Sequence, residues 1–284
     1  MQDDVKSPIL VHSRVDPERV LHLPAGRFTN GHPLVALVLG VAATVAVFGL
    51  AARAPGNVVS QSLTQRGPVP YAIVLFTCWA LGILLIKAMK IRAQRKVLAY
   101  PITPDGQGFS LSPATVGGVI DEIYRIVDDP RRFVLSNRVM LALSNLRNMQ
   151  RIGDVRDTLE SQAEFDEALA ESGYTFLRAL IWAIPVLGFI GTVLGLSAAV
   201  GAFSSVLAAA SEIDQIKPAL REVTTGLAVA FETTLQGLLG AMGVHLLMTS
   251  VKRSEERFLD DCREYTQRQI VGRLRLFAGE ADGA

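Results

Sequence analysis

The residues of this sequence that could do chemistry lie inside long apolar runs, where polar side chains are unfavourable. Glu232 is the only charged residue of the run that ends at Ser250, and Thr233 and Thr234 follow it directly. Another threonine, Thr192, lies in the preceding run, which contains no Asp, Glu, Lys or Arg from Ala179 to Ala210. Lipid cannot satisfy this set of polar groups. The helices that contain them must therefore pack on protein or line a wet path.

Two roles remain open for Glu232. A carboxylate in the middle of a membrane costs a few kcal/mol on insertion scales. It is there either as a hydrogen-bonded structural group that holds two helices together or as a group that handles ions or protons. On a regular helix it lies about 200° from Thr234, so the two cannot point squarely into one narrow pore.

A threonine hydroxyl carries no charge at neutral pH, but it can hydrogen-bond water or the carboxyl group of another molecule. Thr192, on the preceding apolar run, is the natural partner of Thr234. A pore lined by these hydroxyls needs its titrating group from elsewhere.

The sequence lacks the patterns of other functional classes. It has no Ser/His/Asp set, no glycine-rich phosphate loop and no cluster of metal ligands, and His12, His22 and His32 are scattered. No basic stripe with interleaved aromatic residues suggests nucleic acid. We therefore expect no enzyme, no cofactor, no metal site and no nucleic-acid partner.

Composition indicates a protein that crosses the membrane several times. Half of the residues are hydrophobic and 19% are charged, against about 25% charged in an ordinary soluble domain. A helix of about 20 apolar residues spans a bilayer core. The predicted spans are 33–52, 69–86, 175–210 and 223–250, and we expect the third to extend out of the bilayer on the cytoplasmic side.

Positive charge predicts the orientation of these spans. Basic residues gather directly after the second span, from Lys87 to Lys96, and such clusters stay in the cytoplasm. The predicted cytoplasmic parts are the N-terminal tail 1–32, the segment 87–174 and a C-terminal helix in 251–284, and the predicted extracytoplasmic loops are 53–68 and 211–222. Within 87–174, the apolar spacing predicts a bundle of three helices at 115–127, 132–150 and 154–172.

Small residues mark one side of the third span. Gly188, Gly191 and Gly195 recur along it, and such rows let helix backbones approach closely in membranes. We expect these three glycines to set helix packing together with Gly237 and with Pro185, a position where the helix can kink.

Two segments, IPVLGFIGTVLGL (184–196) and GLAVAFETTLQGL (226–238), resemble the MotA/TolQ/ExbB proton channel family. The resemblance covers about 175–253, and the four-span layout is that of MotA-like members. It implies an all-α integral membrane protein that forms a homopentamer around two copies of a single-span MotB/TolR/ExbD-like partner. The partner would supply a protonatable Asp.

The resemblance also implies roles for single residues. Thr192 and Thr234 fall on the family's two pore threonines, and Pro185 falls on a proline found in MotA-like members. The ion pathway would then contain Thr192 and Thr234, with Thr233 and Glu232 beside them. The chain departs from TolQ and ExbB at Val229, where those members have a glutamate, and its own acid lies one turn further on.

We therefore expect a proton-conducting subunit of a bacterial inner-membrane complex that converts ion-motive force into motion of its partner. A sodium-driven version of the same motor and a non-conducting membrane scaffold are the alternatives. The sequence does not indicate whether flagellar rotation, envelope energisation, gliding, secretion or phage defence is powered.

Overall fold

The computed structural model describes residues 8–11, 18, 26–53, 56–103, 109–112, 114–144, 152–208 and 213–275. The expected tail histidines His12 and His22, part of the loop 211–222 and the end of the C-terminal tail lie outside these residues. Within them the structure is helical without a named strand, and two isolated β-bridges pair Leu10 with Val127 and Leu111 with Leu274.

The chain divides into two compact units. One contains 33–84 and 175–249, which we call the apolar unit, and the other contains 1–32, 85–174 and 250–284, which we call the polar unit. Helices α5 and α10 contribute to both units. Four helices among the described residues are long and apolar enough to cross a membrane, because long charge-free runs favour continuous helix.

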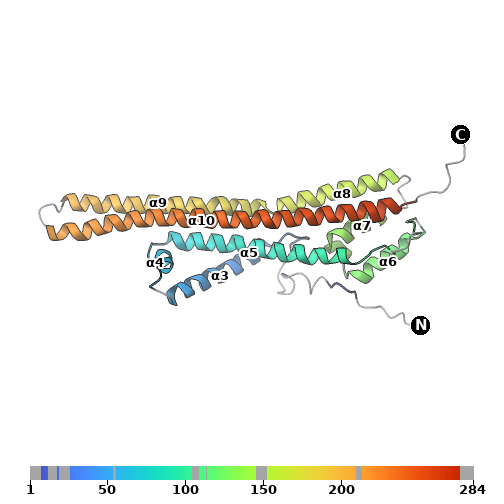
Figure 1. The fold of residues 1–284 in the computed structure, drawn as a ribbon, viewed down its shortest axis with the longest axis horizontal. Coiled ribbons are helices and arrows are strands. Elements are labelled where there is room, and N and C mark those ends of the chain that lie inside the picture. The colour runs from blue at the N-terminus through green and yellow to red at the C-terminus, as the bar shows by residue number, and fades with distance from the viewer. Residues whose placement is uncertain are drawn as a thin grey trace. The chain divides into compact units, whose positions relative to one another are not determined.

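The apolar unit is built from two helical pairs. The first pair is α3 (Pro33–Arg53) and α5 (Val69–Arg95), joined through the short α4 (Val58–Thr64), and the second is α9 (Thr175–Ala208) and α10 (Ile213–Tyr265). Figure 1 shows α9 and α10 side by side along the length of α9. Helix α10 begins inside the expected loop 211–222 and continues past the predicted span into the polar unit.

Glycines bring α9 and α10 into close contact. A Cβ atom at Gly195 would lie 2.6 Å from the backbone nitrogen of Ala230, and one at Gly188 would lie 2.9 Å from the carbonyl oxygen of Thr233. A Cβ at Gly237 would lie 3.0 Å from the carbonyl oxygen of Ile184. The glycine row therefore packs helices within one chain, and it is not by itself an indication of oligomer contacts.

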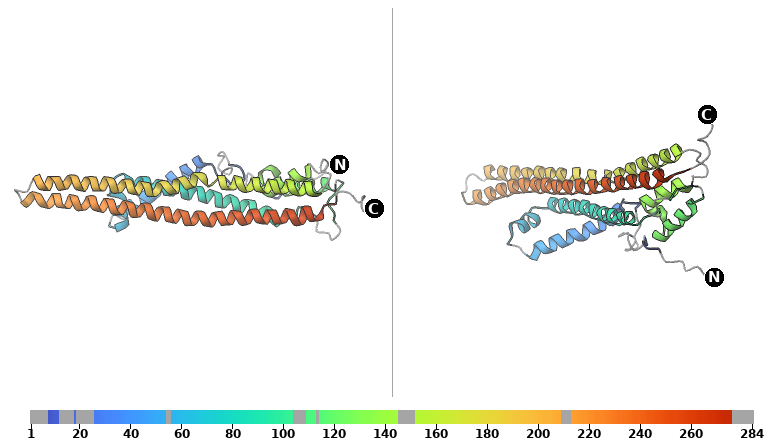
Figure 2. Two further views of the ribbon diagram at one scale, coloured as in Figure 1. Left: turned by 90° about the horizontal axis from the view of Figure 1, so that it is seen from above. Right: turned by 45° about the vertical axis from the view of Figure 1, so that its right-hand side comes forward.

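The α9–α10 pair extends further than the α3–α5 pair. Val69 and Ile73 at the start of α5 pack with Ile184 and Ala241, whereas contacts of Gly195 with Ala230 lie further along the hairpin. Figure 1 and Figure 2 both show the hairpin continuing past the start of α5. With 34 residues, α9 is about 51 Å long at 1.5 Å per residue, compared with a bilayer core of about 30 Å.

The polar unit contains a helix in each of the three ranges expected between the second and third spans, although residues 145–150 of the expected helix 132–150 lie outside the described residues. These helices are α6 (Val116–Ile126), α7 (Val134–Ser144) and α8 (Ile152–Ser172), and the last lies beside the C-terminal part of α10 (Figure 1). Their apolar faces form one core with α10, in which Ile123, Val139 and Phe258 are fully buried. Short helices Lys96–Ala99, Pro130–Arg132, Thr266–Ile270 and Val271–Arg273 complete the unit.

Parts of the N-terminal tail belong to this unit. Leu10 pairs with the end of α6, where its backbone nitrogen donates to the carbonyl oxygen of Ile126 at 2.8 Å. Glu18 is buried and lies 2.6 Å from Lys90 of α5. Its carboxylate also accepts from the backbone nitrogens of Gly26 and His32. The polar composition of 1–32 gave no indication of this packing.

Candidate functional site

The two threonines of interest meet across the α9–α10 contact. The hydroxyl groups of Thr192 on α9 and Thr234 on α10 are hydrogen-bonded to each other. Each also lies within reach of two backbone carbonyl oxygens, those of Gly188 and Ala230, at 3.2 to 3.3 Å. Both side chains are partly buried in the apolar unit.

The hydroxyl protons and oxygen lone pairs of Thr192 and Thr234 determine which hydrogen-bonding groups this pair can bind. Two hydroxyl groups have two protons, so one proton joins the hydroxyls and the other goes to a carbonyl oxygen. Oxygen lone pairs then remain to accept from water or from a protonated carboxyl group. If both hydroxyls turn away from their present acceptors, they can instead donate two hydrogen bonds to a carboxylate. The pair thus suits either protonation state of an acid through a rotation of two hydroxyl groups.

Thr233 has a different position from Thr234. Its side chain is fully buried, and its hydroxyl donates to the carbonyl oxygen of Val229 at 2.8 Å. A Cβ atom at Gly191 would collide with this side chain. Thr233 therefore fills the interface between α9 and α10, where the absence of a side chain at Gly191 makes room for it.

Glu232 has a partner that the sequence analysis did not identify. Arg66, in the bend between α4 and α5, donates from Nε to Oε2 at 3.0 Å and from Nη2 to Oε1 at 2.8 Å. One turn further on α10, Gln236 Nε2 donates to the carbonyl oxygen of Ser62 at 3.1 Å. The only signal for this pair in the sequence was a single acid in the fourth span and two arginines, Arg53 and Arg66, between the first two spans.

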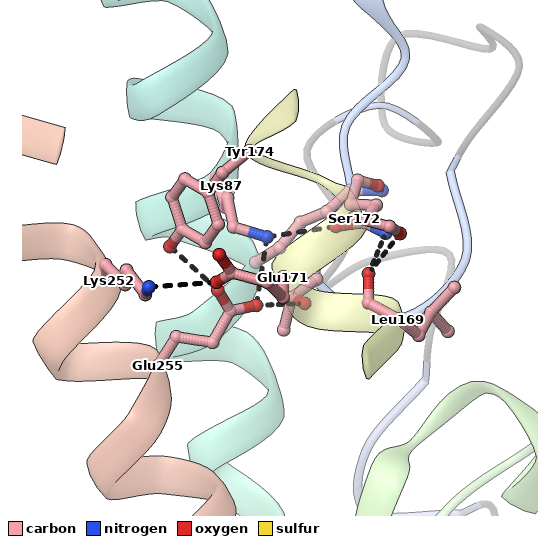
Figure 3. Close-up of polar contacts among 10 residues, drawn as sticks. Lys87, Leu169, Glu171, Ser172, Tyr174, Lys252 and Glu255 are labelled. Carbon is pink, nitrogen blue, oxygen red and sulfur yellow. Dashed lines mark hydrogen bonds and ion pairs between the residues drawn. The ribbon is translucent and has the colours of Figure 1, made fainter. Parts of the chain in front are cut away.

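A second polar cluster lies in the polar unit (Figure 3). Glu255 of α10 accepts hydrogen bonds from Thr29 and from Tyr174, the latter at 2.7 Å, and lies 3.0 Å from Lys87 of α5. Lys87 also donates to Asn30 at 2.9 Å and lies 4.4 Å from the centre of the Tyr174 ring. The Lys87 and Glu255 side chains are each 2% exposed.

The geometry of this cluster indicates a structural role. Burial raises the pKa of Tyr174, and the Glu255 carboxylate raises it further, so the phenol stays protonated and donates. All five groups are used in contacts between the N-terminal segment, α5, α10 and the turn after α8. The sequence analysis interpreted Lys87 only as an orientation signal.

A cleft of about 470 Å³ lies beside this cluster, and Glu171, Lys252 and Arg263 are among its lining residues. The basic groups are paired, since Lys252 lies 2.9 Å from Glu171 and Arg263 pairs with Glu160. Across the described ranges, no group of three or more His, Cys, Asp or Glu residues could hold a metal ion.

Residues 129–264 match the model of the MotA/TolQ/ExbB proton channel family. No curated protein and no solved structure matches the chain. The family match includes both segments on which the resemblance was based, 184–196 and 226–238, and it confirms that resemblance.

Proposed function

We propose that this chain, whose residues 129–264 belong to the MotA/TolQ/ExbB proton channel family, is the proton-conducting subunit of an inner-membrane complex. Members of this family are channel and transducer proteins rather than enzymes. The complex would convert ion-motive force into motion of a single-span MotB/TolR/ExbD-like partner. In this proposal both termini and the polar unit lie in the cytoplasm.

The observation that supports conduction most directly is the hydroxyl pair of Thr192 and Thr234. It lies at the close contact of α9 and α10 in the apolar unit and can accept from a protonated acid or donate to an ionised one. The proton carrier itself would be an acidic side chain of the partner, which binds at the hydroxyls and exchanges its proton there. Release of the proton would then change which hydroxyl arrangement is favoured.

The proposed assembly is a homopentamer around two partner helices. The exposed side chains of α9 and α10 support it, because large apolar residues such as Phe189, Val193, Phe231 and Met242 are each more than half exposed. Copies of the chain, partner helices and lipid can share this surface. Exposed apolar residues on α3, such as Val38 and Val45, suit an outer position against lipid.

The test is ion flux into proteoliposomes that contain the chain co-purified with its partner. We expect a proton flux in the wild-type complex that the double variant Thr192→Val, Thr234→Val abolishes without loss of assembly. Thr44→Val is the matched control, because the Thr44 hydroxyl donates only within α3, to the carbonyl oxygen of Gly40 at 2.7 Å. It should conduct as the wild type does.

Full flux in the double variant would exclude the threonine pair from the ion pathway. A sodium gradient in place of the pH gradient distinguishes a sodium-driven motor from a proton-driven one. A wild-type complex that assembles with its partner but passes neither ion would favour the scaffold function.

A further inference from the structure

We propose that Arg66 holds Glu232 in a fixed ion pair that anchors the segment between the first two spans to the fourth span, and that Glu232 is not part of the ion path. The anchor itself does not depend on the proposed function, whereas the statement on conduction rests on it.

The contacts between the two side chains have the geometry of a planar fork. Two different guanidinium nitrogens of Arg66 each donate to a different carboxyl oxygen of Glu232, at 3.0 and 2.8 Å. Paired bonds of this kind fix orientation as well as distance. Because the guanidinium keeps its charge at any physiological pH, the partner that it fits is an ionised carboxylate.

A second contact shows that the whole segment is attached, rather than one side chain. Gln236 donates to the backbone of Ser62, one helical turn from Glu232 on α10. The same segment is also attached to α3, because the Ser60 hydroxyl donates to the carbonyl oxygen of Ala51 near the end of that helix, at 2.6 Å. The segment that contains α4 is therefore connected to both α3 and α10.

The backbone after Arg66 makes this placement possible. Gly67 has a φ of 81°, in the left-handed region that favours glycine. The chain then turns into α5, where Val69 packs with Ile184 and Ala241. Arg66 thus directly precedes a turn that only glycine adopts easily, and this turn leads into a buried helix start.

Charge balance gives a physical reason for the pair. Glu232 is the one charged residue of the apolar run that ends at Ser250, and an unpaired charge is unfavourable in such a run. Within the chain the Arg66 and Glu232 side chains are only 23% and 32% exposed. Each charge compensates the other, so removal of either side chain would leave its partner unpaired.

Glu232 and Thr234 point in different directions from α10, so the ion pair is separate from the threonine pair. Thr234 contacts Thr192 and the carbonyl oxygen of Gly188 on α9, whereas Glu232 contacts the segment before α5. A proton relay through Glu232 would need the carboxylate to leave Arg66. The structure instead places the hydroxyl pair and the ion pair on different sides of α10.

A charge exchange tests the anchor. The variants are Arg66→Glu, Glu232→Arg and the double exchange, with Gln65→Glu as a control because Gln65 is the exposed neighbour of Arg66. In the purified complex we expect each single reversal to lower the thermal unfolding midpoint by about 5 °C or more, since like charges then face each other. The double exchange should recover most of that shift, and the control should change nothing.

Ion flux in the same variants tests the second half of the proposal. The double exchange has no carboxylate at position 232, so we expect it to conduct at about the wild-type rate once it is assembled. If it regains thermal stability but passes no ions, Glu232 is on the ion path. If the single reversals leave the midpoint unchanged, there is no anchor.

A double variant without charges at the two positions covers the case in which the exchanged side chains cannot adopt the geometry of the native pair. Arg66→Gln with Glu232→Gln should assemble and conduct, and failure of both double variants to regain stability would overturn the anchor. A wild-type complex without ion flux would contradict the proposed function, while the thermal measurements would still decide whether the anchor exists.

Discussion

Glu255 depends on Lys87 for its charge balance. Its carboxylate accepts from Thr29 and Tyr174 and faces the Lys87 ammonium at 3.0 Å, with almost no exposure to water. Removing one member of a buried ion pair is far more damaging than removing both, because the remaining charge stays desolvated. Lys90, on the same helix as Lys87, forms a second buried pair with Glu18 of the N-terminal segment, at 2.6 Å.

Lys87→Met is therefore expected to lower the free energy of unfolding by about 3 to 5 kcal/mol. Adding Glu255→Gln to this variant should recover much of the loss, since no unpaired charge then remains. Denaturant unfolding of the purified protein measures both effects. Lys252→Met is the control, because its pair with Glu171 is partly exposed and should contribute at most about 1 kcal/mol. Equal losses in the single and double variants would contradict the charge argument.

Cys262 should be chemically inert while the protein is folded. Its side chain is fully buried in the core of the polar unit, and burial raises the pKa of its thiol to about 12. The thiolate is the reactive form, so at pH 8 only about one thiol in 10⁴ would be ionised. In a Cys78→Ser background we expect negligible alkylation at pH 8, a rate that rises with pH, and full alkylation after unfolding. Rapid labelling of the folded protein would show that this core opens.

At the scale of helices, alanine substitutions on α9 can distinguish the effect of close helix packing from the effect of helix propensity. Gly195→Ala places a Cβ 2.6 Å from both the Ala230 nitrogen and the Gly226 carbonyl oxygen, which are backbone atoms that cannot move aside easily. A Cβ at Gly201, on the same helix, meets no heavy atom within 4 Å. We expect Gly195→Ala to lower the thermal unfolding midpoint and Gly201→Ala to leave it unchanged or raise it slightly, because alanine favours helix. Equal shifts in the two variants would contradict the close contact of α9 and α10.

Much of the helix content could be predicted from apolar runs and their lengths. Four long apolar helices and three amphipathic ones were expected, and the structure contains them. The helix ends were less predictable. Helix α10 starts at Ile213 and passes through Pro218, although a proline beyond the first turn removes a helical hydrogen bond and normally disfavours helix. It then continues beyond Ser250 since its charged tail also favours helix.

The pairs of side chains could not be predicted in the same way. Arg66 and Glu232 lie 166 positions apart in the sequence, and no local periodicity connects such residues. The same holds for Lys87 and Glu255. Thr192 and Thr234 were identified as partners because both interrupt apolar runs and because the family resemblance supplied their roles. A polar residue whose partner lies in a different run needs the tertiary structure to reveal it.

At the scale of the whole chain, charge placement predicts how the protein is oriented in the membrane. Two of the basic residues that follow the second apolar run, Lys87 and Lys90, are neutralised by buried carboxylates in the folded protein. Arg92, Arg95 and Lys96 remain exposed or partly exposed. Positive charge acts on topology during insertion, before Glu18 and Glu255 can pair with the lysines. All five residues therefore favour a cytoplasmic position for the polar unit.

Labelling of single cysteines in a Cys78→Ser background tests this orientation. Gln65→Cys lies in the expected extracytoplasmic loop 53–68 and Asp121→Cys lies in the expected cytoplasmic segment 87–174, and both native side chains are exposed. A membrane-impermeant maleimide should label Gln65→Cys in intact spheroplasts and Asp121→Cys only after permeabilisation. Burial of Cys262 keeps the background low, so each signal reports one position. Labelling of Asp121→Cys in intact spheroplasts, with Gln65→Cys protected, would reverse the topology and place the polar unit outside the cytoplasm.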